Sequence, residues 1–404
     1  MFMQGRLQIV CAAVLLLTLS GCNNDSKSGA AAIQAGQLVS SQNYQSQLAS
    51  GLAEVSQRVE YRMPSVNGGL TVATAVVMLP KGTAPAGGWP VVAWAHGTTG
   101  VADQCAPSLS QDLAGYDGLI AQLLSQGYAV VAPDYEGLGS AGNHPYLNLQ
   151  SAANSLIYAV KAAQSNWSKL STSWVAVGHS QGGHAALGAS QYALGAGVGQ
   201  YLGAVAFAPA SNLKSTLELS QARVAQLAAA GQTSAATSAL AQTLGFTGLV
   251  VAGLRQTESV DYSQVFQAQS RPVAQLAESE CFTGLATAFA TDIVQYVQRN
   301  AVSVAAYPAL QDNYATVPAI QTFFDRTEPA RVKLSTPTLL LQGAGDTTVP
   351  KVLTDSLYQQ METLDSNVNY QVFDTADHGS VVAQGIPSML TFLDARFGLT
   401  PNAQ

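Results

Sequence analysis

Short apolar runs alternate with helical segments along much of this chain, and that alternation limits the folds open to it. Runs such as "YAVVAP" at 128–133 and "SWVAVG" at 173–178 are apolar or small at almost every position. Strands buried on both faces have this composition, and such strands are typical of parallel sheets with helices on both sides. The sequence therefore predicts an α/β fold with a mostly parallel central sheet and helices on both faces.

The expected elements form two blocks on either side of a long helical stretch. The first block contains strands at 69–79, 89–97, 128–133, 173–178 and 203–209, and helices at 111–125, 150–164 and 181–194. The second block contains strands at 336–342 and 369–374, and helices at 353–364 and 381–397. We therefore expect one α/β core made of residues 41–211 and 332–404.

Residues 212–331 interrupt the alternation. They contain helical patterns such as "TDIVQYVQRN" and no comparable succession of strands and helices. Loops at the carboxyl ends of parallel strands line the ligand crevice of an α/β sheet. We therefore expect this insertion, placed after the sixth strand, to form a helical cap or lid over an active site. The alternative is a structural extension that takes no part in binding.

The N-terminus has the pattern of an export signal. An arginine is followed by an apolar run at 9–19 that is short for a membrane-spanning helix. The run ends in Leu-Ser-Gly-Cys at 19–22, which resembles the bacterial lipobox. The resemblance implies a lipoprotein signal peptide at 1–21, lipid attachment to Cys22 and a polar tether at 22–40. An ordinary signal peptide that happens to contain a cysteine is the alternative.

These features predict a protein of the bacterial cell envelope that is anchored to a membrane by lipid. Several acyl chains on one cysteine would hold it stably, because a single weak signal gives only reversible binding. Asn23 follows the cysteine. Lipoproteins retained in the inner membrane commonly carry aspartate at that position, so the outer membrane is favoured. The sequence leaves open whether the protein lies on the periplasmic or the surface face.

Charge and cysteine usage narrow the possible partners. The net charge is −7, only 10% of the residues are charged, and Lys and Arg form no cluster, so nothing indicates nucleic-acid binding. Cys11 lies in the signal region and Cys22 is the expected lipid site, which leaves Cys105 and Cys281 as a pair in an oxidising compartment. We predict a disulfide between them, with two buried free thiols as the alternative. The cysteines show no metal-ligand spacing with histidine, and no cofactor is indicated.

The segment "VAVGHSQGGHAAL" at 175–187 joins an expected buried strand to an expected helix. Gly-x-Ser-x-Gly alone is weak evidence, since a chain of this length contains one by chance in roughly one case in seven. A tight turn between a strand and a helix, however, is the structure that projects a nucleophilic serine out of the backbone. Ser180 is therefore the candidate nucleophile, and the positive end of the following helix would favour the developing negative charge.

A nucleophilic serine needs a base, and in this type of fold the base follows it in the chain. The sequence has five histidines: His96, His144, His179, His184 and His378. Only His378 lies beyond the insertion, in "FDTADHGS" after the last expected strand, so it is the candidate base. His179 and His184 flank the serine, and we expect them to pack or to form hydrogen bonds.

The base in turn needs an acid that orients it. Asp346, in "LLLQGAGDTTVP", directly follows an expected strand and is the candidate acid. Asp374 and Asp377 are alternatives closer to the base in sequence, although their surroundings are typical of loop or turn residues. Asp134, in "PDYEGLG", precedes the serine in the chain, so we interpret it as structural or as part of the pocket wall.

A tetrahedral intermediate needs preorganised backbone donors for its oxyanion. Gln181 would supply one donor because it directly follows the serine. The loop at 96–100, "HGTTG", would supply the other, since it follows an expected strand of the core. We assign this second donor to Thr98, with Gly97 or Thr99 as alternatives. A threonine hydroxyl could add a third donor.

The order of these motifs is that of the α/β-hydrolase superfamily. Three further motifs resemble the secretory lipase family, which includes the fungal lipase A type and many bacterial lipoproteins: "CAPS" at 105–108, "PDYEGLG" at 133–139 and "HPYL" at 144–147. The resemblance extends over about 91–397, with the insertion matching in place rather than in recognisable sequence. It implies an α/β-hydrolase fold with a helical cap that houses an acyl-binding tunnel.

Together the residues and the resemblance predict a serine carboxylic ester hydrolase, a lipase or esterase. It would act on apolar lipid or small-molecule esters through Ser180, Asp346 and His378 and an acyl-enzyme intermediate. We expect a monomer that needs neither metal nor cofactor. An aromatic-ester or polyester hydrolase, or less readily a peptidase, would use the same residues. A surface lipoprotein that only binds ligands on a hydrolase scaffold is the alternative outside enzymes.

Overall fold

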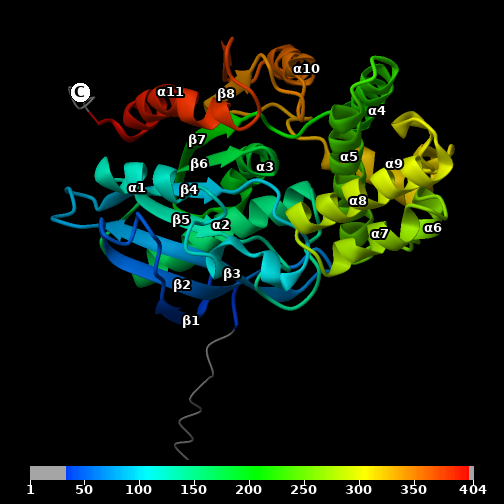
Figure 1. The fold of residues 1–404 in the computed structure, drawn as a ribbon. Helices are drawn as coiled ribbons and strands as arrows, with labels where there is room; N and C mark the ends of the chain where they lie inside the picture. The colour runs from blue at the N-terminus through cyan, green and yellow to red at the C-terminus, as the bar shows by residue number, and fades with distance from the viewer. Residues whose placement is uncertain (1–32, 400–404) are drawn as a thin grey trace, which may run out of the picture. The chain divides into compact units, whose positions relative to one another are not determined.

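A nine-stranded sheet is the centre of the structure, a computed structural model that describes residues 33–399 (Figure 1). Its strand order is β1-β2-β3-β5-β4-β6-β7-β8-β9. The strands are β1 (Leu38–Asn43), β2 (Ala53–Pro64), β3 (Leu70–Pro80), β4 (Trp89–Ala95), β5 (Ala129–Pro133), β6 (Leu170–His179), β7 (Gln200–Phe207), β8 (Thr338–Gly343) and β9 (Val368–Phe373).

The sheet is mostly parallel, as the sequence predicted. From β5 through β4, β6, β7 and β8 to β9 every neighbouring pair is parallel. The edge formed by β1, β2 and β3 is antiparallel, and β3 pairs antiparallel with β5. Because the parallel strands all point the same way, their carboxyl ends meet along one edge, where the candidate site lies.

Helices cover both faces of the sheet. One face carries α1 (Asp117–Ser125) and α11 (Ser380–Phe397), and the other carries α2 (Leu149–Asn166), α3 (Gln181–Ala196) and α10 (Lys351–Thr363). Along β6, Trp174 and Ala176 pack on the α2 and α3 face, whereas Val175 and Val177 pack on the α1 and α11 face. The continuous apolar run of this strand is therefore explained by burial on both sides.

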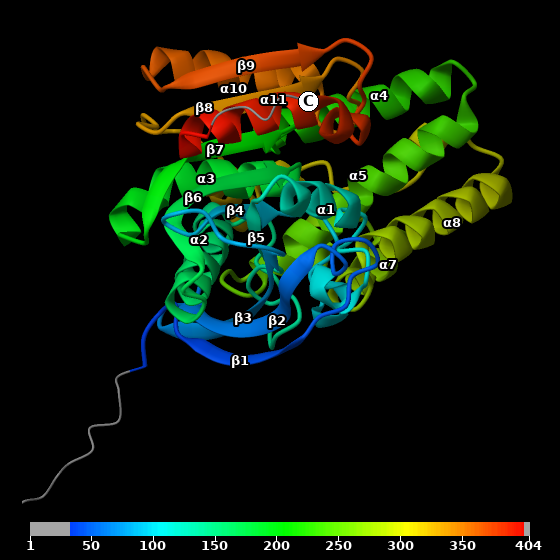
Figure 2. The same cartoon turned by 90° about the vertical axis from the view of Figure 1, so that its left-hand side faces the viewer.

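The insertion forms a helical cap with its own hydrophobic core. Its helices are α4 (Leu213–Ala229), α5 (Thr233–Leu254), α6 (Tyr262–Val265), α7 (Arg271–Gln275), α8 (Phe282–Asn300) and α9 (Pro318–Thr327). Figure 2 shows α4, α5 and α8 side by side, with α5 in contact with both of the others. Helix α5 is long and apolar enough to cross a membrane, but most of its apolar window is buried, as in a core helix.

Some boundaries differ from the sequence-based expectation. The cap follows β7, the seventh strand in the described part of the chain, and not the sixth as expected; neither β1 nor β2 had been located from the sequence. Residues 38–40 belong to β1 and pair with β2, so the expected tether at 22–40 is too long at its C-terminal end. Helix α1 begins only at Asp117, because Leu113 and Ala114 have positive φ values of 50° and 57° that no helix tolerates.

The predicted signal peptide, Cys22 and residues 23–32 of the predicted tether lie outside the described residues. The predicted bond between Cys105 and Cys281 is present as a disulfide. It joins a short 3₁₀ helix of the core, η1 (Asp103–Cys105), to the residue that precedes α8 of the cap. The core and the cap are thus linked covalently beside the carboxyl edge of the sheet.

Candidate active site

Ser180 sits in a tight turn between β6 and α3. Its φ of 59° and ψ of −118° are rare for a residue with a side chain, and a strained turn of this kind projects a nucleophilic serine out of the backbone. A Cβ at Gly178 would lie 2.1 Å from the carbonyl oxygen of Gly182, and a Cβ at Gly182 would lie 1.9 Å from that of Ala95. Only glycine fits at either position, which explains the two glycines of the motif.

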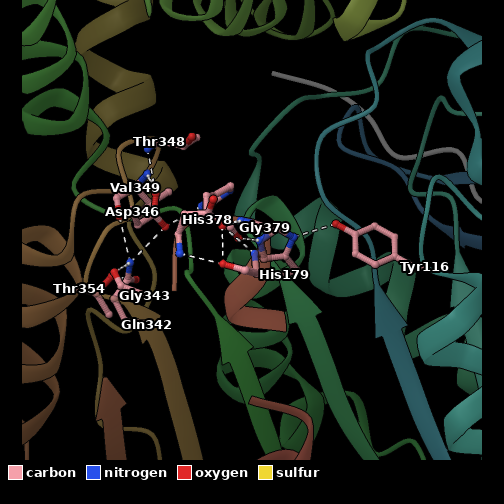
Figure 3. A network of polar contacts seen from close by, with 12 residues as sticks. Tyr116, His179, Gln342, Gly343, Asp346, Thr348, Val349, Thr354, His378 and Gly379 are labelled. Atoms are coloured by element: carbon pink, nitrogen blue, oxygen red, sulfur yellow. Dashed lines mark hydrogen bonds and ion pairs between the residues drawn. The ribbon is translucent and has the colours of Figure 1, made fainter. Parts of the chain in front are cut away.

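Asp346 and His378 approach each other from loops that follow neighbouring parallel strands, β8 and β9. Figure 3 shows the imidazole directed toward the carboxylate, and the distance between His378 Nδ1 and Asp346 Oδ2 is 2.7 Å. The carboxylate is buried, whereas the side chain of His378 is 20% exposed. The structure therefore brings the predicted acid and base together.

The carboxylate of Asp346 is held on both oxygens. Oδ1 accepts hydrogen bonds of 2.8 Å from the backbone N–H groups of Thr348 and Val349. Oδ2 accepts a bond of 3.1 Å from Gln342 Nε2 in addition to that from His378. The Gln342 amide is itself oriented, since its Oε1 accepts a bond of 2.7 Å from the hydroxyl of Thr354. The orientation of the carboxylate toward His378 is thus fixed by the surrounding loop.

The other acid candidates lie elsewhere. Asp374 and Asp377 are exposed, and Asp377 accepts bonds from the backbone of residues 379 and 380. Asp134 is buried near β3, where it accepts bonds of 2.6 Å from the Thr74 hydroxyl and 2.8 Å from the Ser108 N–H. Burial raises the pKa of Asp134 to about 6. These contacts support the structural interpretation of Asp134.

His179, next to the serine, links Tyr116 to the loop that carries His378 (Figure 3). Its Nε2 donates a bond of 2.7 Å to the backbone carbonyl of His378, and its Nδ1 accepts one of 2.8 Å from the hydroxyl of Tyr116. The same hydroxyl accepts a longer bond of 3.3 Å from the N–H of Gly97. Burial and the neighbouring His378 ring lower the pKa of His179 to about 3, so its ring is neutral.

The remaining histidines are also buried and neutral. Burial lowers the pKa of His96 and His184 to about 4 and that of His144 to about 3. His184 lies 2.8 Å from the carbonyl oxygen of Thr327 at the end of the cap. Each of these rings has a hydrogen-bonding partner, as was expected for the pair beside the serine.

Two hollows meet at Ser180. The first, here called the cap cavity, has a volume of about 330 Å³ and lies between α4, α5, α9 and the core. The second, here called the disulfide groove, has a volume of about 590 Å³ and is lined by the Cys105–Cys281 bond and by His378. Thr98, a predicted oxyanion donor, lines both, and Gln181 lines the cap cavity.

Residues 108–404, most of the chain, match the secretory lipase family. The chain belongs to that family. It is accordingly a carboxylic ester hydrolase of the lipase and esterase type, as its motifs predicted. No protein with a curated description matches the sequence.

Several solved structures share the fold of this secretory lipase. Lipase A of Candida antarctica in its closed state has a TM-score of 0.69 at 17% identity, with 92% of this chain and 84% of that chain covered. A rice cell wall degrading esterase of Xanthomonas oryzae has a TM-score of 0.60 at 22% identity, with coverage of 90% and 97%. A protein of Legionella pneumophila has a TM-score of 0.67 at 17% identity, with coverage of 89% and 98%.

Two residues of the site were not found from the sequence. Gln342 donates a hydrogen bond to the carboxylate of Asp346. A polar residue at the end of the apolar strand "TLLLQ" could have indicated it. Tyr116 contacts His179 across 63 positions of the chain, and nothing in its local pattern distinguishes it from an ordinary core tyrosine.

Proposed function

We propose that this secretory lipase cleaves apolar carboxylic esters through Ser180, His378 and Asp346, with an acyl-enzyme intermediate. The observation that carries the proposal is the 2.7 Å contact between His378 Nδ1 and the Asp346 carboxylate, which three other N–H groups also hold, in a groove lined by both His378 and Ser180. This arrangement leaves Nε2 of His378 to act on the serine.

The reaction follows from the position of each group. With its Nδ1 proton donated to Asp346, the imidazole accepts the hydroxyl proton of Ser180 at Nε2 while the serine oxygen attacks the ester carbonyl. The backbone N–H groups of Thr98 and Gln181 bind the oxyanion that forms. The imidazolium then gives its proton to the leaving alcohol, and water releases the acid by the reverse steps.

Each of the two hollows would hold one part of the ester substrate. His378 protonates the alcohol, so the alcohol must lie on the side of the disulfide groove, which His378 lines. The acyl chain then enters the cap cavity. Large apolar side chains line that cavity, among them Leu213, Leu217, Val250, Phe323 and Phe324. Burial of an alkyl chain against them would supply binding free energy of about 0.8 kcal/mol per CH₂.

A fluorophosphonate probe tests the nucleophile. We expect the purified enzyme to be labelled on Ser180 and Ser180→Ala to be neither labelled nor active, while Ser211→Ala, another buried serine beyond the next strand, is labelled normally. Labelling that persists in Ser180→Ala would exclude the assignment.

The proposal that the cap cavity binds the acyl chain can be tested with a series of p-nitrophenyl esters from acetate to palmitate, together with one aromatic ester. Rates that rise from acetate towards longer chains would support the cap cavity as acyl site, and a preference for acetate would contradict it. The wide disulfide groove favours one variant of the proposal, an enzyme for esters with a bulky aromatic or polymeric alcohol. Hydrolysis of any ester by the purified protein rejects the alternative of a lipoprotein that only binds.

The cellular location is part of the proposal. The lipobox-like segment supports lipid attachment to Cys22 and anchoring in the bacterial envelope, with the outer membrane favoured. We propose that the anchored protein is a monomer. Metabolic labelling with an alkyne fatty acid should mark the wild type and not Cys22→Ser. Light scattering of the detergent-solubilised protein should give the mass of one chain. An unlabelled wild-type protein would refute the anchor.

A further inference from the structure

The HPYL segment, residues 144–147, lies between the proposed oxyanion donors and the cap. Its sequence is one of the three motifs that resemble the secretory lipase family, and the mechanism above gives it no role. In the structure, His144 contacts the side chain of Gln181, and Tyr146 contacts the side chain of Thr98. One short segment therefore touches both residues whose backbone N–H groups would bind the oxyanion.

The contact with Gln181 is directional. His144 Nδ1 donates a bond of 2.9 Å to the carbonyl oxygen of Glu136, which leaves Nε2 of the ring as an acceptor. Gln181 Nε2 donates to it at 2.7 Å, whereas Gln181 Oε1 is buried without a partner among the described residues. Burial keeps His144 neutral by lowering its pKa to about 3, so the acceptor persists at any working pH. The side chain of Gln181 is thus oriented by His144.

The contact with Thr98 joins two hydroxyl groups. Tyr146 Oη lies 2.8 Å from Thr98 Oγ1, and both residues line the cap cavity. Burial raises the pKa of Tyr146 well above its usual value, so the phenol keeps its proton. The loop that carries Thr98 is held further by its neighbour Thr99, whose carbonyl oxygen accepts a bond of 2.8 Å from the N–H of Phe282 in the cap.

The other side of the HPYL segment supports α5 of the cap. A Cβ at Gly253 of α5 would lie 2.6 Å from the backbone nitrogen of Tyr146 and 3.0 Å from the carbonyl oxygen of His144. The backbone of α5 therefore packs directly on the backbone of the segment, and only glycine permits this approach. A shift of α5 must move residues 144 and 146.

We propose that the HPYL segment couples the position of α5 in the cap to the oxyanion hole. His144 and Tyr146 then act as positioning residues for Gln181 and Thr98. The inference rests on the proposed function of those two backbone donors. A donor displaced by a fraction of an ångström loses much of its effect on the tetrahedral intermediate while ground-state binding changes little. The coupling should therefore appear in kcat rather than in KM.

Gly253→Ala tests the coupling from the cap side, and Gly248→Ala on the same helix is its matched control. Alanine favours the helix at both positions. A Cβ at Gly248 would make only ordinary contacts of 3.5 Å or more. We expect kcat for a p-nitrophenyl ester to fall about 10- to 100-fold in Gly253→Ala at unchanged KM. Gly248→Ala should keep the wild-type kcat. Equal kcat values in both variants would overturn the proposal.

Tyr146→Phe tests the same coupling without backbone strain, and it decides the question if Gly253→Ala fails to fold. We expect kcat to fall about tenfold, with KM and the thermal unfolding midpoint nearly unchanged. The inhibition constant of octaneboronic acid, whose serine adduct is tetrahedral, should rise in parallel. Thr98→Val should lose about as much of kcat as Tyr146→Phe does. The double variant should have a kcat no lower than that of either single variant. Losses that multiply would show that Tyr146 does not act through Thr98.

Failure of this inference can be told from failure of the proposed function. If Ser180→Ala retains esterase activity, the proposed function fails. If Ser180→Ala is inactive while Gly253→Ala and Tyr146→Phe both keep the wild-type kcat and boronate affinity, only the coupling through the HPYL segment is refuted.

Discussion

Replacing Asp346 by asparagine should inactivate the enzyme through the tautomer of His378. Asparagine has nearly the same shape, so the outcome depends on which way its amide points. Oδ1 of the native carboxylate accepts bonds of 2.8 Å from two backbone N–H groups, one buried and one partly buried. An NH₂ group in that place would leave both donors unpaired, at a cost of about 1–3 kcal/mol each. The amide oxygen must therefore stay there.

The NH₂ group of the variant then occupies the place of Oδ2 and faces His378 Nδ1. It donates to that nitrogen, so the ring proton moves to Nε2, where it blocks acceptance of the serine proton. We expect kcat to fall about 10⁴-fold, equal to about 5.5 kcal/mol of transition-state stabilisation. The bond from Gln342 to Oδ2 is also lost, since two amide groups would face each other, and this should lower the free energy of unfolding by about 1–2 kcal/mol.

Initial rates with a p-nitrophenyl ester, together with urea unfolding curves, measure both effects. Asp377→Asn is the matched control, because it removes the same charge one position before His378 from an exposed side chain. We expect its kcat to stay within about twofold of wild type, as is usual for surface changes. The reasoning is refuted if Asp346→Asn keeps more than a tenth of the activity, or if Asp377→Asn shows the large loss.

Three further predictions concern acid, the disulfide and Tyr116. Burial holds the pKa values of His96, His144, His179 and His184 at about 3–4, so the unfolded chain binds protons that the native protein does not. The free energy of unfolding should therefore decrease as the pH is lowered from 6.5. The slope should be about 4 kcal/mol per pH unit near pH 5, once the opposite contribution of the buried Asp134 is included. A flat profile of urea midpoints between pH 7 and 5 would contradict this. Replacing both cysteines of the disulfide by serine should destabilise the protein by about 5 kcal/mol, because the bond closes a loop across 176 positions, and a calorimetric midpoint within a degree of wild type would count against it. Tyr116→Phe leaves His179 Nδ1 and the Gly97 N–H without their hydrogen-bonding partner. It should lower the free energy of unfolding by about 1–3 kcal/mol and reduce kcat several-fold. Tyr158→Phe, at a partly exposed position of α2, should change neither quantity.

Much of the core could be predicted because its signals are local. The apolar runs at 128–133 and 173–178 correspond to β5 and β6, and the turn at Ser180 lies where the glycines placed it. Chain order selected Asp346 and His378 as candidates among several acids and histidines, and the structure places these two side chains in contact. Local pattern and chain order are the kinds of information that a single sequence carries.

The parts that were missed depend on pairing across the chain. Strand β2 reads "AEVSQRVEYRMP", and its polar residues hide a strand that becomes stable only between β1 and β3. Helix α1 begins late because of a left-handed turn at two ordinary residues, Leu113 and Ala114. The side-chain contacts of His144 with Gln181, Tyr146 with Thr98 and Tyr116 with His179 join residues that lie 37 to 63 positions apart. No periodicity in one segment reports a partner at that distance.

The disulfide also determines how the molecule would respond to a protease. Between α4 and α5 the chain passes through an exposed turn at residues 230–232, the kind of site where proteolytic cuts occur. That turn lies inside the covalent loop that Cys105 and Cys281 close. A single cut there would leave both fragments joined, and they would separate on a gel only after reduction. The cap could therefore be nicked without being released from the domain it covers.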